Sequence, residues 1–338
     1  MGEPVAAGGD LPAARFLYRP SAPYDLALTG ARFTRWPEIV DRFDGATYRR
    51  LMPLGRGSLL VTVRQVGPVG RPVLSVSLRG REARREEGRA AAERVVAIGL
   101  GAGLDVRAFY KAFRSDALLA APLRHFRGLR IAGTPSLWEA LVTAVLSQQV
   151  SLIFAYDMRR ELSLAFGRRA RIRGESFVAF PEPRRIAEQT LRGLRGFRLS
   201  GAKASAVLRL AEAFASEALS EEGIARLPDD EAIARLVAIK GVGPWTAEIG
   251  LLRGQGRPDV FPGGDLGVVK YLATRLLGHP ERVAERAMRE FAERWRPYRG
   301  LALVYAYAEM DRRKAAPSPA SGNPQPSSRR SPPRANGS

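Results

Sequence analysis

The N-terminal third of the chain carries two segments with the pattern of β-strands. Residues 58–65 (SLLVTVRQ) and 72–78 (PVLSVSL) are rich in β-branched residues at roughly alternating positions, as a half-buried sheet requires. Between them, the GPVG sequence at residues 67–70 is typical of a turn. Residues 81–94 are charged and rich in alanine, so they predict an exposed helix. We therefore expect a β-containing domain with trailing helices over residues 15–125.

From about residue 132 the apolar positions recur with a helical period. Thr134 and Pro135 have the residue types of an N-cap and a first helical turn. Further helices are expected at residues 151–166, 183–194, 202–215 and 229–239. The second half is thus predicted to be all-α, with a helical domain over residues 126–228 and a second helical region over residues 229–315.

The two ends of the chain lack a folding pattern. Residues 316–338 consist largely of proline, serine, glycine and arginine, which bury too little apolar surface to offset ordering, so a basic disordered tail is expected. Residues 1–14 are expected to be flexible and lack the segments of a signal peptide. The chain has no apolar run long enough to span a bilayer. We therefore expect a cytoplasmic protein without a membrane partner.

Composition narrows the chemistry. The chain of 338 residues has no cysteine and two histidines, which excludes disulfides, thiolate-bound zinc, iron–sulfur clusters and a cysteine nucleophile. Its 54 lysines and arginines exceed its 34 acidic residues, giving a net charge of +20. An arginine-rich, basic chain suits nucleic acid. Biased codon usage produces the same composition, so charge needs a site before it indicates a partner.

One stretch combines two helices with a tight glycine turn. The helix expected over residues 229–239, capped by Asp229 or Asp230, ends near Gly241, and Pro244 suits the first turn of a second helix. Glycines at such a turn adopt backbone angles that other residues resist and let a phosphate reach the amides. Gly-x-Gly alone is more typical of an ordinary αα-turn. The longer GVGPWTA sequence that starts at Gly241 is far more specific.

With this hairpin the chain resembles the helix-hairpin-helix (HhH-GPD) DNA glycosylase superfamily and, within it, the AlkA-type 3-methyladenine DNA glycosylases II. The most specific match is GVGPWTA at residues 241–247 together with the later Asp265. Weaker matches lie at residues 23–25 (PYD), 146–151 (LSQQVS) and 293–298 (ERWRPY). The resemblance implies an α+β fold, in which a TBP-like antiparallel sheet precedes an all-α core of two helical subdomains.

Asp265 begins another apolar helix after the hairpin. Its type and place fit a simple N-cap, which contributes about 1 kcal/mol, and a helix N-terminus favours the charged carboxylate. N-glycosidic cleavage needs such a fixed anion, because the sugar acquires oxocarbenium character as the base departs. The resemblance implies that Asp265 is the catalytic aspartate, which stabilises this cation and assists the attacking water. The two roles are compatible.

The hairpin also bears on the type of reaction. Bifunctional glycosylases depend on a lysine directly after the hairpin, whose amine forms a Schiff base with the sugar. Trp245 holds that place, so the resemblance implies a monofunctional enzyme that leaves an abasic site. Lys240, Gly241, Gly243 and Thr246 are expected to face the DNA backbone. Hairpins of this family often hold Na⁺ or K⁺ on backbone carbonyls, so we expect no side-chain metal site and no other cofactor.

The resemblance further suggests how the base is read. Gln149 lies at the position of the wedge that fills the gap left by an extruded nucleotide, although the glutamine pair there also fits a helix junction. Trp245 and Tyr307 fall at aromatic pocket positions, where ring faces attract a cationic purine by about 1–3 kcal/mol. Tyr307 fits a core position as well. A third aromatic position falls on Arg32, with Phe33 beside it as the candidate wall.

These features together predict a base excision repair enzyme that acts on double-stranded damaged DNA as a monomer. The expected bases are 3-methyladenine and 7-methylguanine, with hypoxanthine and ethenoadenine as further candidates. Two alternatives stay open: a non-catalytic DNA-binding protein that keeps the hairpin, and a glycosylase for an oxidised base. Asp265 in its context disfavours the first, and Trp245 in the place of lysine disfavours the second.

Overall fold

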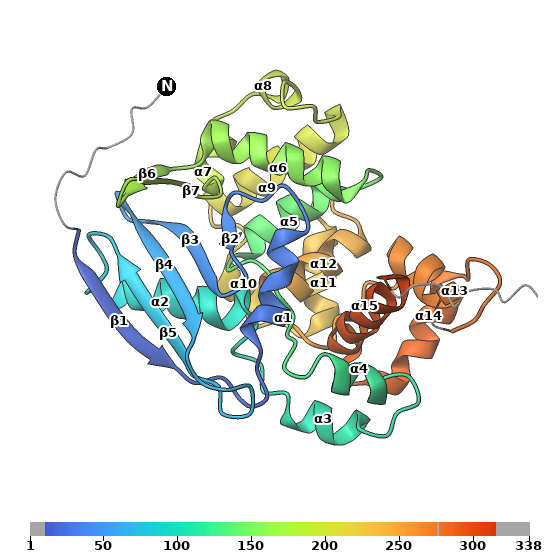
Figure 1. Cartoon of the computed structure of the whole chain (residues 1–338). Coiled ribbons are helices and arrows are strands. Elements are labelled where there is room, and N and C mark those ends of the chain that lie inside the picture. The colour runs from blue at the N-terminus through green and yellow to red at the C-terminus, as the bar shows by residue number, and fades with distance from the viewer. Residues whose placement is uncertain (1–10, 276, 316–338) are drawn as a thin grey trace, which may run out of the picture.

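The N-terminal domain is built on a five-stranded antiparallel sheet in the computed structural model, which describes residues 11–275 and 277–315. The strands are β1 (Ala13–Tyr18), β2 (Asp41–Phe43), β3 (Thr47–Leu54), β4 (Gly57–Gln65) and β5 (Leu74–Arg79). Their order in space is β1-β5-β4-β3-β2, so β1 and β2 form the edges (Figure 1). β4 and β5 confirm the two predicted strands. The tail expected over residues 316–338 lies outside the described residues.

The other three strands do not follow from the hydrophobic pattern. β1 begins at Ala13, so the last two residues of the end expected to be flexible lie in a strand. In β3, Arg49 and Arg50 interrupt the apolar positions. Arg50 is nevertheless buried, because it pairs with Asp41 of β2 and with Glu139, which lies 89 residues away. A strand that buries paired charges lacks the alternation of apolar and polar residues by which strands are predicted.

One face of this sheet packs against α2 (Glu86–Arg94) and the π-helical turn η2 (Val95–Gly99). The exposed helix expected over residues 81–94 is therefore shorter and partly buried. Residues 81–85 form turns, and Ala92 is fully buried in the core of the sheet domain.

Helices form most of the remaining described chain. They are α1 (Leu26–Gly30), α3 (Arg107–Phe113), α4 (Ala120–His125), α5 (Leu137–Ser147), α6 (Leu152–Phe166), α7 (Pro183–Ala187), α8 (Leu191–Arg195), α9 (Gly201–Ala215), α10 (Glu221–Ala225), α11 (Asp229–Val237), α12 (Pro244–Gly254), α13 (Ala273–Arg275), α14 (Glu285–Ala292) and α15 (Arg299–Ala315), with the shorter turns η1 (Ala31–Thr34), η3 (Gly267–Leu272) and η4 (Glu293–Trp295). The single helix expected over residues 183–194 is thus two short ones, α7 and α8.

The start of α5 differs from the prediction. Ser136, not Thr134, is the N-cap, and its hydroxyl accepts a hydrogen bond from the amide of Glu139. The hydroxyl of Thr134 donates to the carbonyl of Ser136 at 2.8 Å, so it shapes the residues before the helix.

The start of α11 also differs. Pro228 is its N-cap and no side chain caps the helix. Asp229 and Asp230 lie in the first turn instead, where their charges favour the helix dipole without a capping hydrogen bond.

The second half of the chain is not all-α. β6 (Arg169–Ile172) and β7 (Glu175–Val178) form an antiparallel hairpin. Its two turn residues, Arg173 and Gly174, have positive φ angles of 52° and 80°, as a tight hairpin turn requires. The hairpin buries Ile172 and Phe177 against the N-terminal sheet. Both strands have four residues, and β6 contains two arginines, so the hydrophobic pattern does not predict them.

Two apolar cores lie in the helical part, and α12 contributes to both. Ala247 and Leu251 of α12 pack with α5, α6 and α9 in one core, whereas Leu252 packs with α15 and the segment after Asp265 in the other. α3 and α4 pack in this second core. In Figure 1, α12 accordingly lies between the α5–α9 group and the α13–α15 group.

A buried cluster of charges joins the sheet domain to the helices. Arg50 of β3 pairs with Asp41 at 2.6 Å and with Glu139 of α5, and Arg159 of α6 pairs with Glu139 at 2.5 Å and with Asp41 at 3.3 Å. All four side chains are almost fully buried. Burial opposes the charged form of Asp41, but Arg50 and Arg159 outweigh it and lower the pKa of this carboxyl.

Candidate active site

α11 and α12 meet at the tight turn predicted from the sequence. Gly241 has a φ of +101°, and a Cβ there would lie 2.5 Å from the Cβ of Ala206 in α9. Only glycine fits this position. Gly243 has an ordinary φ of −88°, and a Cβ there would meet nothing within 4 Å. Gly241 therefore allows the turn to pack, whereas Gly243 leaves open space at the N-terminus of α12, where no side chain caps the amides.

A glutamine braces this turn from the neighbouring helix. Gln148, which follows α5, donates to the carbonyl of Gly241 at 3.2 Å and to the hydroxyl of Thr246 at 2.9 Å. Thr246 is buried, so its hydroxyl serves the hairpin rather than DNA. Sequence reasoning did not identify the brace, because no pattern links residues that lie 93 and 98 positions apart.

Asp265 ends the loop that leads from α12 to η3 and accepts hydrogen bonds from three neutral donors. The indole N–H of Trp245 donates to Oδ2 at 2.8 Å. The phenol of Tyr307 and the amide of Gly267 donate to Oδ1 at 2.9 and 2.8 Å. Three donors from α12, α15 and η3 fix the orientation of the carboxylate. The contact with the amide of Gly267 also supports the N-cap reading.

The donors orient the charge without cancelling it. Burial raises the pKa of the Tyr307 phenol well above its usual range, and Asp265 raises it further, so the phenol stays a proton donor. Within the described residues, no lysine or arginine forms an ion pair with Asp265. The site thus holds an oriented anion, which is what stabilisation of a developing cation requires.

Trp245 and Tyr307 therefore have a role that the sequence did not predict. Both were expected as aromatic walls of a base pocket, and the structure uses their polar atoms to hold Asp265. Both side chains remain partly exposed, which leaves ring surface for a ligand. Their roles as pocket walls stay predictions.

The candidate third wall lies elsewhere. Phe33 is buried in the core of the sheet domain, with its ring centroid 5.2 Å from that of Tyr48, so it is not a pocket residue in this structure.

Arg32, the neighbour of Phe33, donates to the hydroxyl of Tyr156 in α6 at 3.2 Å. Burial, followed by the charge of Arg32, lowers the pKa of Arg253 to about 9, while Asp265 and other groups oppose this. Arg32, a cation, thus holds the position at which the third aromatic wall was expected.

Gln149 lies exposed between α5 and α6, in a conformation unusual for its type. Its φ is 55°, in the left-handed region where a non-glycine residue is strained. Gln148 takes the junction role that both glutamines fit, whereas Gln149 projects into solvent. Its place as the wedge stays a prediction.

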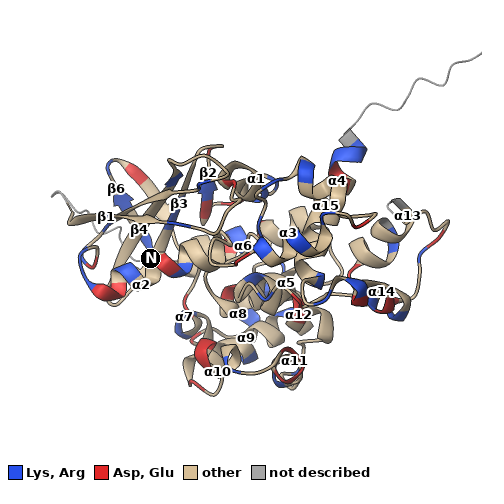
Figure 2. Cartoon of the chain, turned by 90° about the horizontal axis from the view of Figure 1, so that it is seen from below, with Lys and Arg blue, Asp and Glu red and all other residues tan. Residues whose placement is uncertain are grey.

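Charge on the surface is not gathered on one element. Figure 2 shows lysine and arginine over the sheet domain and the helices alike, with acidic residues between them. Lys240 is exposed at the hairpin, and its carbonyl accepts a hydrogen bond from Arg209 at 3.4 Å. This position suits contact with a DNA phosphate.

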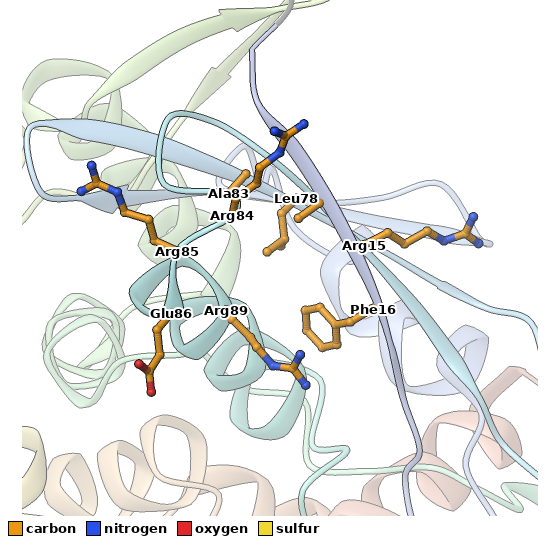
Figure 3. Close-up of a pocket in the computed structure, with 9 residues that line it drawn as sticks. Arg15, Phe16, Leu78, Ala83, Arg84, Arg85, Glu86 and Arg89 are labelled. Atoms are coloured by element: carbon orange, nitrogen blue, oxygen red, sulfur yellow. The ribbon is translucent and has the colours of Figure 1, made fainter.

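A cavity of about 410 Å³ lies away from these residues, over β1, β5 and the start of α2. It is lined by Ala14, Arg15, Phe16, Leu78, Ala83, Arg84, Arg85, Glu86 and Arg89. The arginines point in different directions (Figure 3), and Arg89 lies over the ring of Phe16. They do not converge on a common point, so the cavity is not a second reaction centre.

Among residues 11–275 and 277–315, no group of three or more His, Cys, Asp or Glu side chains is arranged to hold a metal ion. No helix in these ranges is long and apolar enough to cross a membrane.

Residues 142–297, which include the hairpin and Asp265, match the family described as HhH-GPD superfamily base excision DNA repair protein. The chain is 32% identical over 204 residues to the DNA-3-methyladenine glycosylase of Bacillus subtilis (strain 168), covering 60% of this chain and 67% of that protein. It is 30% identical over 182 residues to DNA-3-methyladenine glycosylase 2 of Escherichia coli (strain K12), covering 53% and 60%. The chain thus spans about two thirds or less of these relatives.

The fold agrees with a solved structure over a longer range. The 3-methyladenine DNA-glycosylase from Archaeoglobus fulgidus superposes with a TM-score of 0.75 at 25% identity, covering 89% of this chain and 100% of that one. The sheet domain and the helical core therefore share one α+β architecture with a glycosylase of this kind.

Proposed function

The chain belongs to the 3-methyladenine DNA glycosylases of the HhH-GPD superfamily of base excision repair, and from that premise we propose that it hydrolyses the N-glycosidic bond of alkylated purines. One observation supports this chemistry most strongly. Asp265 is held by Trp245, Tyr307 and the amide of Gly267, all neutral donors, beside a DNA-binding hairpin.

The carboxylate acts on charge that appears during the reaction. As the base departs, positive charge spreads over C1′ and the ring oxygen of the sugar, and the fixed anion of Asp265 stabilises it. The same carboxylate can accept a proton from the water that attacks C1′. An N-alkylated purine leaves as a neutral base, so little further help is needed at the leaving group.

We propose that the reaction stops at an abasic site. A lyase step needs an amine that attacks C1′, and Trp245 occupies the place of that lysine. Lys240 is exposed on the other side of the first glycine. The ammonium group of Lys203 is turned inward and donates to the carbonyl of Leu146 at 2.8 Å, so it caps α5.

The proposed substrates are 3-methyladenine and 7-methylguanine in double-stranded DNA, with hypoxanthine and ethenoadenine as further candidates. The partly exposed rings of Trp245 and Tyr307 offer surfaces on which a flipped base can stack. Arg32, where an aromatic wall was expected, adds a cation near Tyr156. A cation there disfavours charged bases and favours neutral ones, which supports keeping hypoxanthine and ethenoadenine among the candidates.

We propose that the enzyme meets DNA as a monomer through Gly241, Gly243, Lys240 and the backbone of Thr246, with Gln149 as the wedge. Because the proposed substrate is chromosomal DNA, we also propose a cytoplasmic location. We retain a monovalent cation, Na⁺ or K⁺, on the hairpin carbonyls as a proposal. If the DNA affinity is equal in sodium, potassium and choline chloride at one ionic strength, the proposal of a bound monovalent cation is wrong.

The activity is tested with duplexes that each carry one 3-methyladenine, 7-methylguanine, hypoxanthine or ethenoadenine. We expect free base from the alkylated duplexes and strand breaks only after alkali, which cleaves abasic sites. Breaks without alkali would indicate a lyase. Tight binding without any released base would favour the non-catalytic alternative, and release from an 8-oxoguanine duplex alone would favour the oxidised-base alternative.

A further inference from the structure

A buried carboxylate lies on α12, three residues after Trp245 and outside the contacts of Asp265. Glu248 is 3% exposed, and its Oε1 pairs with Nη2 of Arg289 in α14 at 2.7 Å. Its Oε2 is buried and has no hydrogen-bond partner among the described residues. An unsatisfied buried oxygen costs free energy, so stability alone does not explain a glutamate here.

Arg289 connects Glu248 to the loop that carries Asp265. Its Nη1 donates to the carbonyl of Phe261 at 3.1 Å, and its Nε donates to Glu285 at 2.8 Å. The guanidinium thus joins α12, α14 and the loop through separate N–H groups, which a planar fork of five donors allows. Phe261 lies four residues before Asp265 in the chain.

The loop also packs tightly against these side chains. A Cβ on Gly263 would lie 2.7 Å from Cγ of Arg289, and one on Gly264 would lie 2.8 Å from Oε2 of Glu285. A Cβ at either position would force these side chains to shift. The two glycines before Asp265 are therefore explained by the close approach of the loop to Arg289 and Glu285.

We propose that Glu248 and Arg289 are positioning residues, which hold the loop of residues 261–265 so that Asp265 stays at the sugar. The charge on Glu248 keeps Arg289 on the carbonyl of Phe261. α12 then fixes the aspartate twice, because Trp245 binds its carboxylate and Glu248 anchors the backbone that leads to it. This inference rests on the proposed glycosylase function.

The pair gives the reaction a pH dependence of its own. Burial raises the pKa of Glu248 to about 7 against the opposing charge of Arg289, while Glu285 adds to the rise and Arg299 of α15 opposes it. As the pH falls through this value, Glu248 takes up a proton and its ion pair with Arg289 weakens, while Arg289 keeps its contacts with Glu285 at 2.8 and 2.6 Å. We expect the rate of base release to fall with it.

Stability changes in the opposite direction. The pKa of Glu248 in the folded chain lies above its ordinary value of 4.5, so the folded state binds the proton more tightly than the unfolded state. The contribution of this group to stability is then fully present at low pH and is lost as the pH rises toward about 7. A purely structural role would lower activity and stability together.

The test is single-turnover base release by the full chain, measured across the pH range around neutrality, together with thermal unfolding. Glu248→Gln imitates the protonated carboxyl and removes the charge. We expect its rate at alkaline pH to fall about 10-fold, with unchanged DNA affinity, no loss of thermal stability and a flattened pH profile. Arg289→Gln should lose rate similarly, and the double variant should lose no more than either single one.

Arg286→Gln is the matched control, because Arg286 pairs with Glu290 on the exposed face of the same helix at 2.8 Å. Its rate should equal that of the wild type. A Glu248→Gln variant with the wild-type rate and pH profile would overturn the inference, as would a loss of rate matched by a loss of stability. A wild-type chain that releases no base from any duplex would overturn the proposed function as well.

Discussion

The molecule treats carboxylates in opposite ways at its buried junction and at its partly exposed active site. At the junction of the sheet and the helices, Asp41 and Glu139 are each paired with Arg50 and Arg159. At the active site, the hydrogen bonds that Asp265 accepts from the described residues come from the neutral groups of Trp245, Tyr307 and Gly267. The junction therefore cancels charge, whereas the active site orients a charge and leaves it in place.

The difference follows from what each site does. Two domains that meet through buried charges need those charges neutralised, because an unpaired buried ion costs several kcal/mol. A carboxylate that stabilises an oxocarbenium ion loses its effect if an arginine has already paired with it. Neutral donors solve this problem, since they fix the orientation of an anion and supply no net charge.

The largest effect is expected at Asp265 itself. Asp265→Asn keeps the shape and removes the charge, so single-turnover base release should fall by about 1,000-fold or more. DNA affinity, measured on a duplex with an abasic site, should persist. A variant that turns over at nearly the normal rate would remove Asp265 from the mechanism.

Substitutions in the buried charge cluster at the junction should change the stability of the fold rather than the rate of base release. Arg159→Met leaves Glu139 and Asp41 short of a partner and should lower the free energy of unfolding by about 3–5 kcal/mol, measured by denaturant titration. Arg185→Gln, which breaks the exposed pair with Glu188, is the control and should change it by less than about 1 kcal/mol. Equal losses in the two variants would contradict a special role for the junction.

Removing single donors from Asp265 should have intermediate effects. Tyr307→Phe and Trp245→Phe each delete one hydrogen bond to the carboxylate and should slow base release by about 10-fold. Tyr110→Phe deletes a phenol that contacts Tyr305 instead and should leave the rate unchanged. Rates for the two donor variants that match the wild type would show that orientation of the carboxylate is not limiting.

The smallest effect is expected at the open glycine of the hairpin. Gly243→Ala places a methyl group where a phosphate is expected to approach and should weaken binding about fivefold on all duplexes alike. The rate at saturating DNA should not change. Wild-type affinity across a salt titration, whose slope reports phosphate contacts, would show that DNA does not approach Gly243.

The part of the site that could be predicted from the sequence lies in local motifs. Gly241, Gly243 and Asp265 lie in one short region whose spacing alone indicates a hairpin and a carboxylate. The two side-chain donors to Asp265, Trp245 and Tyr307, lie 20 and 42 residues away. Their hydrogen bonds depend on how α12 and α15 pack, which hydrophobic periodicity does not specify.

The wrong predictions of the fold and of the pocket also arise from tertiary packing that the sequence pattern does not specify. β3 was missed because Arg50 breaks its alternation, and this arginine is acceptable only because Glu139, 89 residues away, lies opposite it. Phe33 was placed in the pocket from its position in the chain alone, whereas its burial against Tyr48 depends on how the sheet closes. Tertiary partners decided each case.

The central claim is that the anion of Asp265 works because no lysine or arginine among the described residues pairs with it. Single-turnover release of 7-methylguanine by Tyr307→Lys, compared with Tyr307→Phe, tests this most directly, since the two variants differ in a positive charge beside Oδ1. We predict that the lysine variant is about 100-fold slower than the phenylalanine variant, while it binds DNA at least as tightly. Equal rates for the two variants would contradict the claim.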